Sequence, residues 1–469
     1  MSTNQKFFGT DGVRGVANRY PITPEVAMRL GRLAAKVLVA PMLEKPSESG
    51  HKIWPRCIVG KDTRISCDLL EAAFAAGMAS EGVDVSLAGV VPTPAVSLLV
   101  REEDAAMGVV ISASHNSFPD NGIKFFNGGG QKLSNEQEAA LEAAIAEEPI
   151  APEDDNARPT GGKIGRISRM ENAAERYNHF VFHEVGNSDH HLLGGLKVAL
   201  DCANGASSKT SPEILRVLGA EVIVFSDEPN GVNINDDCGC THPGVISKLV
   251  TEHGAQVGIA HDGDADRIAL VDENGVALDG DELMAIVALH YLSTGKLKGD
   301  TLVATIMSNC GLDAAMEAAG GKLVRAGVGD RFVIQEMRKD GFNFGGEQSG
   351  HIVCGDYLMT GDGIIAGVEV LKIMVETGKP LSELRQCLKK FPQVLLALPV
   401  SSKPPVEELL EAQELIRETE EALGNAGQVL LRYSGTEPKI RLLVEGEDPE
   451  YIQQQADKIS AAITARIGA

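Results

Sequence analysis

The 469-residue sequence has few aromatic and few basic residues. Aromatic residues make up 4% of the chain, and 43 lysines and arginines stand against 66 aspartates and glutamates, for a formal net charge of −23. A nucleic-acid-binding surface needs clustered positive charge to displace counterions from phosphates. The excess of acidic residues therefore excludes a nucleic-acid partner, and an anionic substrate requires a local positive site.

Long apolar runs and a cysteine framework are also missing. No apolar run is long enough to span a bilayer, and the amino end lacks the pattern of a signal peptide. We therefore expect no membrane association and a cytoplasmic location. The eight cysteines are scattered, as in proteins of a reducing compartment. The one local cluster, at residues 238–242 (CGCTH), lacks the second pair of ligands that a structural zinc site needs, so we interpret its cysteines as thiols.

Strand and helix patterns alternate along most of the chain. The length favours three or four domains. Three successive blocks of alternating strands and helices predict three related αβα domains with mainly parallel mixed sheets, hence an α/β fold. After residue 392 the rhythm changes, which predicts a smaller C-terminal α+β domain containing a helix over residues 406–423. The predicted domains cover residues 1–165, 166–272, 273–390 and 391–469.

Residues 110–116 (VISASHN) form an apolar run that breaks into a short polar loop. Such a run predicts a buried strand that ends at the carboxyl edge of a sheet, where open α/β folds place their active sites. Ser114 at the loop is our candidate nucleophile. Read alone, the stretch fits an ordinary strand-end turn at least as well, because serine and asparagine favour turns.

Residues 261–267 (HDGDADR) place three carboxylates, Asp262, Asp264 and Asp266, at alternate positions. Three carboxylates held together without a cation would repel one another, which favours a metal site over a solvated acidic turn. A calcium helix-loop-helix is excluded because Arg267 stands where that loop needs glycine and strand patterns flank the loop. Mg²⁺ at this position would suit phosphoryl transfer.

Three further stretches combine glycine with polar groups. Residues 7–15 (FFGTDGVRG) offer Arg14 as a phosphate ligand, or form a plain hairpin. Residues 345–351 (GGEQSGH) suit the binding of sugar hydroxyls, or a surface turn. Residues 432–441 (RYSGTEPKIR) concentrate two arginines and two hydroxyls between two strand patterns, which favours a phosphate site.

These stretches, in the order serine loop, aspartate loop, sugar loop and phosphate loop, resemble the α-D-phosphohexomutase superfamily nearly end to end. The resemblance implies four domains around a central cleft and an isomerase with a serine that is phosphorylated in the resting enzyme. That serine corresponds to Ser114, which precedes His115, and we count both among the catalytic residues. The phosphate on Ser114 and the three aspartates of the aspartate loop would bind Mg²⁺.

The resemblance also implies roles for the other loops. Glu347 and Ser349 would hold sugar hydroxyls. Arg14 and Lys124 would lie near the transferred proton and phosphoryl group, with Lys124 either a general acid-base group or a cation that pairs with phosphate. The residues implied for the non-reacting phosphate are Arg432, Ser434, Gly435, Thr436 and Arg441.

The implied reaction converts glucosamine 6-phosphate into glucosamine 1-phosphate through a 1,6-bisphosphate. Glucosamine 1,6-bisphosphate or glucose 1,6-bisphosphate would serve as primer, and the product would feed amino-sugar and cell-wall precursor synthesis in a bacterial host. Gln348 and residues 196–204 and 307–309 resemble the amino-sugar branch. The implied partner is a small sugar phosphate, and the family suggests a homodimer.

Other readings of the same machinery remain open. A phosphomannomutase or phosphoglucomutase would use the same loops on a neutral hexose, a phosphatase would pass the phosphoryl group to water, and a sensor would only bind the sugar phosphate. Ser117 and Tyr433 stand where the family usually has proline, and Cys240 stands where it has serine. We expect these departures to tune rate or flexibility rather than to abolish function.

Overall fold

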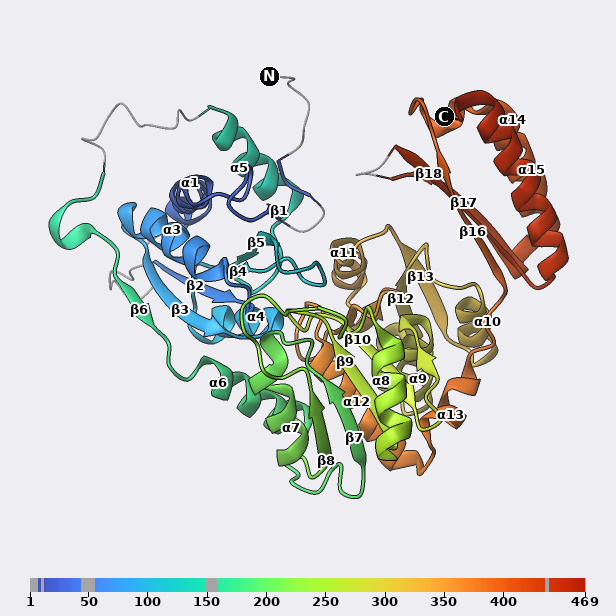
Figure 1. Ribbon diagram of the computed structural model, residues 1–469, viewed down its shortest axis with the longest axis horizontal. Coiled ribbons are helices and arrows are strands. Elements are labelled where there is room, and N and C mark those ends of the chain that lie inside the picture. Colours follow the sequence, from blue (N-terminus) through green and yellow to red (C-terminus); the bar gives the residue numbers. More distant parts are fainter. Residues whose placement is uncertain (1–6, 10–11, 44–54, 148–157, 435–437, 469) are drawn as a thin grey trace. The chain divides into compact units, whose positions relative to one another are not determined.

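The computed structural model describes residues 7–9, 12–43, 55–147, 158–434 and 438–468. The chain divides into two compact units, of which the larger contains residues 1–306 and 324–385 and the smaller contains residues 307–323 and 386–469. Four separate β-sheets of six, five, four and three strands organise the chain (Figure 1).

The six-stranded sheet has the strand order β1-β5-β4-β2-β3-β6. Its strands are β1 (Val13–Val16), β2 (Arg56–Lys61), β3 (Asp84–Val90), β4 (Met107–Ile111), β5 (Asp120–Asn127) and β6 (Ile167–Arg169). The helices of this part are α1 (Pro24–Ala34), α2 (Ala40–Leu43), α3 (Cys67–Ser80), α4 (Thr93–Glu102) and α5 (Asn135–Glu147). Strands β2, β3, β4 and β6 pair in parallel, whereas β5 runs antiparallel to both β4 and β1.

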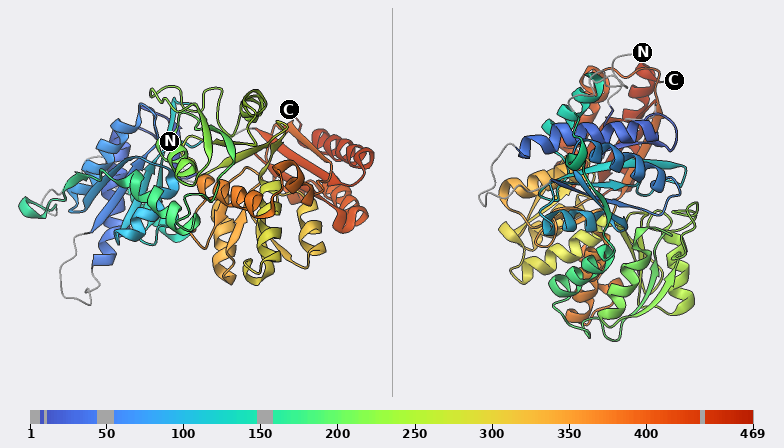
Figure 2. Two further views of the ribbon diagram at one scale, coloured as in Figure 1. Left: turned by 90° about the horizontal axis from the view of Figure 1, so that it is seen from below. Right: turned by 90° about the vertical axis from the view of Figure 1, so that its left-hand side faces the viewer.

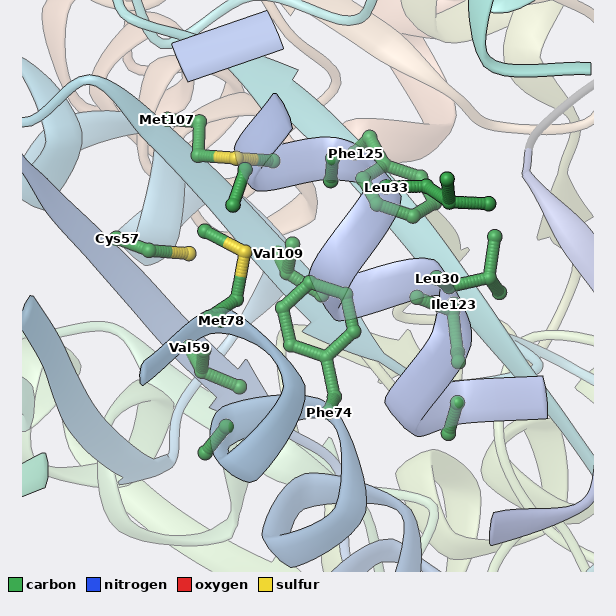
Figure 3. Packing of buried hydrophobic residues seen from close by; sticks show 14 of the residues in the cluster. Leu30, Leu33, Cys57, Val59, Phe74, Met78, Met107, Val109, Ile123 and Phe125 are labelled. Carbon is green, nitrogen blue, oxygen red and sulfur yellow. The ribbon is translucent and has the colours of Figure 1, made fainter. Parts of the chain in front are cut away.

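Helices α1 and α3 pack closely above this sheet. A Cβ atom on Gly31 of α1 would lie 2.3 Å from Phe74 O of α3, so the two backbones approach directly. Figure 3 shows the core beneath them, where Phe74 and Met78 of α3 meet Val59 and Val109 of the central strands. This packing fixes the sheet whose edge carries Ser114.

The five-stranded sheet has the order β11-β10-β9-β7-β8. Its strands are β7 (Lys197–Asp201), β8 (Glu221–Phe225), β9 (Val257–His261), β10 (Ile268–Asp272) and β11 (Ala277–Leu278). The helices along this stretch are α6 (Ala173–Phe180), α7 (Ser211–Val217) and α8 (Pro243–His253). Strand β7 pairs in parallel with β8 and β9, and β10 turns back antiparallel to β9.

The four-stranded sheet has the order β13-β12-β14-β15. Its strands are β12 (Thr301–Thr305), β13 (Lys322–Ala326), β14 (Phe344–Gly346) and β15 (Ile352–Cys354), with helices α9 (Gly280–Ser293), α10 (Gly311–Ala318), α11 (Asp330–Asp340), α12 (Gly363–Thr377) and α13 (Leu381–Leu384) along the same stretch. Strand β14 is parallel to β12 and antiparallel to β15.

The three-stranded sheet lies in the smaller unit and is antiparallel, in the order β16-β18-β17. Its strands are β16 (Gln393–Pro399), β17 (Gly427–Tyr433) and β18 (Lys439–Gly446), and its helices are α14 (Leu410–Leu423) and α15 (Pro449–Ile467). Both helices pack side by side on one face of the sheet (Figures 1 and 2). This arrangement is the helix-on-sheet layer of an α+β domain.

The structure confirms the predicted fold class and corrects details of it. The helix expected over residues 406–423 is divided, because Leu409, buried in the core, leaves the helical conformation between η8 (Val406–Glu408) and α14. Strands β1 and β5 had not been expected. Cys238 and Cys240 form no disulfide with a described residue. The domain boundaries and the central cleft stay predictions. Among the described helices, none is long and apolar enough to cross a membrane.

Candidate active site

The serine loop and the aspartate loop are both connections of antiparallel hairpins. The serine loop joins β4 to β5, with Ile111 opposite Ile123, and the aspartate loop joins β9 to β10, with His261 opposite Ile268. In each sheet the loop therefore connects a strand of the parallel core to an antiparallel strand, β5 or β10, which lies next to the edge strand. The two loops meet, because Ser114 Oγ donates a hydrogen bond of 2.5 Å to Asp262 Oδ2.

Ser114 adopts an uncommon backbone conformation for this contact. Its φ angle is +53°, in the left-handed region, and its side chain is 1% exposed. The backbone N–H of Ser114 donates to Ser112 Oγ at 2.9 Å, which stabilises the turn locally. A buried hydroxyl at the tip of a strained turn is typical of a functional residue rather than of a simple strand end.

The three aspartates of the aspartate loop converge in a buried cluster. Asp262, Asp264 and Asp266 are at most 3% exposed, and one carboxylate oxygen from each lies within 4.8 Å of the others. Thr93 Oγ1 donates to Asp264 Oδ2 at 2.5 Å, whereas none of the described residues donates a hydrogen bond to Asp264 Oδ1. A buried carboxylate oxygen without a donor, within an all-oxygen cluster, fits a hard divalent cation.

The surroundings shift the pKa values of Asp262 and Asp266 in opposite directions. Burial, together with the charges of Asp266 and Asp264, raises the pKa of Asp262 to about 8. Burial alone would also raise the pKa of Asp266, but the cations Lys124 and His351 hold it well below its usual range. Lys124, 1% exposed in β5, places its Nζ 2.7 Å from Asp264 Oδ2 and 3.3 Å from Asp266 Oδ2. The repulsion at Asp262 is what a bound cation would relieve.

His115 is held as a neutral imidazole beside the serine. Arg267 Nη1 lies 3.2 Å from His115 Nδ1, and since a guanidinium only donates, that nitrogen accepts. Burial and the positive charges of Arg267 and Arg14 lower the pKa of His115 to about 4. Arg14 lies on β1 opposite Gly122 of β5, so the structure brings Arg14, His115 and Lys124 to the same sheet edge as Ser114.

The sugar loop, residues 345–351, includes the end of β14 and the connection from β14 to β15, and it adjoins the aspartate loop. Ile268 N donates to Gly350 O at 3.1 Å, and His351 Nδ1 lies 3.7 Å from Asp266 Oδ1. Glu347 is half-buried and accepts a hydrogen bond from Gly329 N at 3.0 Å, while Ser349 is exposed. The two residues predicted to hold sugar hydroxyls therefore lie on a loop that is tied to the aspartate cluster.

The phosphate loop lies in the smaller unit. Arg432 of β17 and Arg441 of β18 are directly opposite each other in the antiparallel register. Burial and the charge of Arg441 lower the pKa of Arg432. Ser434 N donates to Lys439 O at 2.9 Å. Gly435 and Thr436 lie outside the described residues.

Several residues around the site were missed in the sequence. Arg267 is the last residue of the aspartate motif and His351 is the last residue of the sugar-loop motif. Their position in these motifs was the signal that could have indicated them. Thr93 follows β3, and Arg64 follows β2, and both strands reach the same sheet edge as the serine loop. Asn235, whose amide donates to Ser114 O at 2.8 Å, stands in a loop with no pattern that would have indicated it.

Comparison with known families covers most of the chain. Four models of phosphoglucomutase/phosphomannomutase match, namely alpha/beta/alpha domain I at residues 5–150, domain II at 175–275, domain III at 279–391 and the C-terminal domain at 395–462. The phosphoglucosamine mutases of Syntrophotalea carbinolica and Pelobacter propionicus are 46% and 48% identical over 464 residues. That alignment covers 99% of this chain and 98% and 99% of theirs.

Solved structures share the fold. A phosphoglucomutase/phosphomannomutase family protein from Burkholderia thailandensis matches 99% of this chain and 100% of its own, with a TM-score of 0.79 at 22% identity. N-acetylphosphoglucosamine mutase of Aspergillus fumigatus, in complex with GlcNAc-6P and magnesium, matches 79% of this chain and 92% of its own, with a TM-score of 0.59 at 18% identity. A variant of that mutase in complex with glucose 1,6-bisphosphate matches 100% and 97%, with a TM-score of 0.63 at 16% identity. With four domain models in order and full-length relatives at nearly half identity, the chain belongs to the phosphoglucomutase/phosphomannomutase family, among its phosphoglucosamine mutases.

Proposed function

We propose that the protein interconverts glucosamine 6-phosphate and glucosamine 1-phosphate, with Ser114 as the carrier of the phosphoryl group. The observation that carries the mechanism is the contact between Ser114 Oγ and Asp262 inside a buried cluster of three aspartates. The choice of an amino sugar is supported by the full-length relatives named phosphoglucosamine mutase.

In the forward direction, the phosphoryl group leaves Ser114 Oγ and joins the C1 hydroxyl of glucosamine 6-phosphate. The proton of that hydroxyl is given up as Ser114 Oγ takes up a proton, and a 1,6-bisphosphate results. After the intermediate has turned over, its 6-phosphoryl group moves to Ser114 Oγ, which loses its proton, while O6 takes up a proton. The net reaction moves one phosphoryl group and consumes none, so a bisphosphate such as glucose 1,6-bisphosphate primes the serine.

The residues around Ser114 divide the work. Asp262, Asp264 and Asp266, with the phosphate on Ser114, would hold Mg²⁺, which when bound supplies positive charge against the transferred phosphoryl group. Lys124, whose Nζ lies between two carboxylates, would pair with phosphate oxygens. Arg267 orients neutral His115 beside Ser114 Oγ, which lies 3.4 Å from His115 Nδ1. Arg14 adds positive charge at the same edge.

The outer loops bind the rest of the substrate in this proposal. Glu347 and Ser349 hold sugar hydroxyls, and the phosphate loop with Arg432, Ser434, Gly435, Thr436 and Arg441 holds the phosphate that is not reacting. The cytoplasmic location and the homodimer stay predictions from the sequence and the family.

The test compares initial rates on glucosamine 6-phosphate, glucose 6-phosphate and mannose 6-phosphate, each with glucose 1,6-bisphosphate present. We expect kcat/KM for the amino sugar to exceed the others by at least about tenfold, which is ~1.4 kcal/mol of differential transition-state binding. A preference for a neutral hexose would overturn the substrate assignment. Release of inorganic phosphate faster than isomerisation would indicate a phosphatase instead.

A further inference from the structure

Arg64 is a buried arginine that faces the main chain of the serine loop. Its side chain is 0% exposed, and its Nε donates to Asp62 Oδ2 at 2.9 Å. The two terminal nitrogens donate to four carbonyl oxygens, with Nη2 bonded to Ser114 O (2.9 Å) and Asn116 O (2.7 Å) and Nη1 to Ser117 O (2.5 Å) and Asp120 O (3.0 Å). A single guanidinium therefore binds four main-chain carbonyls between Ser114 and Asp120.

Asn235 donates hydrogen bonds to two of the same carbonyl oxygens from a different loop. It lies between β8 and α8, and its Nδ2 donates to Ser114 O at 2.8 Å and to Asn116 O at 3.0 Å. Gly263 of the aspartate loop closes the remaining side, since a Cβ there would lie 2.7 Å from Ser114 O and 2.9 Å from Asn235 Nδ2. The carbonyl of Ser114 is thus enclosed by Arg64, from a loop of the six-stranded sheet, and by Asn235 and Gly263, from loops of the five-stranded sheet.

The loop needs this support for two physical reasons. Carbonyl dipoles turned toward one point repel one another unless donors lie between them, and a guanidinium offers five N–H groups in a fixed fork that a lysine cannot reproduce. Ser114 is also held at a positive φ, a conformation that persists only where the surroundings determine it. The same residue presents its Oγ to Asp262, so any relaxation of its backbone moves the hydroxyl that reacts.

We propose that Arg64 and Asn235 are positioning residues, which hold Ser114 Oγ in line with Asp262 through both phosphoryl transfers. This rests on the proposed role of Ser114 as phosphoryl carrier. Because Asp62 balances the charge of Arg64, the contribution of Arg64 is geometric. Neither residue is bonded to the sugar loop or the phosphate loop in the described contacts, so the effect falls on kcat and not on KM.

The experiment uses the full chain with Arg64→Lys, Asn235→Ala and the control Arg32→Lys. Arg32 is a matched control because it is also buried in the six-stranded domain and pairs with an acid, Glu81 at 3.0 Å, but on α1. For each variant, kcat, KM and the thermal midpoint are measured. Intact-mass spectrometry then follows how fast phosphorylated protein loses its phosphoryl group to glucosamine 6-phosphate and, separately, to water.

We expect Arg64→Lys to lower kcat about 100-fold and Asn235→Ala about tenfold, with KM nearly unchanged, as for a misplacement of about 1 Å at the reacting atom. Transfer to sugar slows by the same factors, while loss to water does not slow. Arg32→Lys lowers only the thermal midpoint. A merely structural role would leave the ratio of transfer to sugar over loss to water unchanged in all three variants.

Wild-type kcat and an unchanged transfer ratio in Asn235→Ala, measured well below its thermal midpoint, would overturn the proposal. If Arg64→Lys does not fold, Asn235→Ala decides alone. If the wild type does not turn over glucosamine 6-phosphate at all, the proposed function fails independently. The positioning role of Arg64 and Asn235 is then tested by the rate at which glucose 1,6-bisphosphate phosphorylates Ser114. The same ranking of the variants would support the role, and equal rates would overturn it.

Discussion

Around Ser114, buried carboxylates lie beside a buried lysine. In the phosphate loop, two partly exposed arginines lie opposite each other. Asp262, Asp264 and Asp266 are almost fully buried beside Lys124. Arg432 is half-buried and lies opposite the exposed Arg441 on neighbouring strands. Like charges directly opposite each other in a sheet are destabilising, so a bound anion would stabilise the second arrangement.

In the proposed function, this difference corresponds to two tasks. Transfer of a phosphoryl group requires a reacting atom fixed to within a fraction of an ångström, and buried hydrogen bonds supply this rigidity. Holding the non-reacting phosphate requires a site that accepts either end of a sugar bisphosphate in turn, and long arginine side chains on a half-exposed strand pair can adapt to both. Mutations in the two regions should therefore fail in different ways.

Ser114→Ala is expected to have the largest effect. Without the Oγ atom no phosphoryl carrier exists, and kcat should fall by at least about 10⁴-fold, as when a nucleophile is removed. The same variant should bind the substrate with nearly wild-type affinity, because the phosphate loop is intact. Isomerisation assays and equilibrium binding of glucosamine 6-phosphate check the two halves of this prediction. Ser112→Ala is the neighbouring control, and equal loss in both variants would contradict the assignment.

Asp264→Asn is expected to come next. The change removes a negative charge from the cluster and should lower kcat by about 10²- to 10³-fold while weakening Mg²⁺ binding. Isothermal titration with Mg²⁺ measures the second effect without turnover. Asp272→Asn, a buried aspartate of β10 outside the cluster, serves as control and should lose stability only. Full activity of wild type in excess chelator would contradict the role of the cluster.

Arg441→Ala should act through binding. The loss of a charge-assisted hydrogen bond to phosphate should raise KM by about 10- to 100-fold, with the phosphorylation of Ser114 chemically intact. Steady-state kinetics give KM, and intact mass after incubation with excess glucose 1,6-bisphosphate gives the phosphorylation. Arg417→Ala, on the exposed face of α14, is the control in the same unit. A loss of kcat at saturating substrate, with KM unchanged, would contradict the assignment of Arg441 to phosphate binding.

The smallest expected effect is that of salt, which should weaken the phosphate loop and leave the buried groups around Ser114 nearly unaffected. Raising the ionic strength from about 0.05 M to about 0.5 M screens exposed charges far more than buried ones. KM for glucosamine 6-phosphate should therefore rise by about two- to fivefold while kcat stays constant. Initial rates in sodium chloride, corrected for magnesium activity, measure both. A fall in kcat without a change in KM would reverse the comparison.

Much of the fold followed from the sequence because strand and helix periods are local properties. The aspartate loop was found because three carboxylates at alternate positions can converge without help from distant residues. Strand β5 was missed because its start, Asp120 to Gly122, resembles a turn, and it becomes a strand only by pairing with β4 and β1. Arg64 and Asn235 could not be assigned because their partners are main-chain carbonyls about 50 and 120 residues away, which leave no side-chain pattern.

The central claim is that Ser114 carries the phosphoryl group between the two positions of one sugar. The most direct test phosphorylates the protein with glucose 1,6-bisphosphate, removes the excess, adds glucosamine 6-phosphate and records the intact mass together with the sugar products. We predict that Ser114 gains the mass of one phosphoryl group, that any serine discharged by glucosamine 6-phosphate is matched by an equal amount of a glucosamine bisphosphate, and that glucosamine 1-phosphate forms as the serine regains its phosphoryl group. Isomerisation by a protein that never carries phosphate, or by Ser114→Ala at the wild-type rate, would contradict the account.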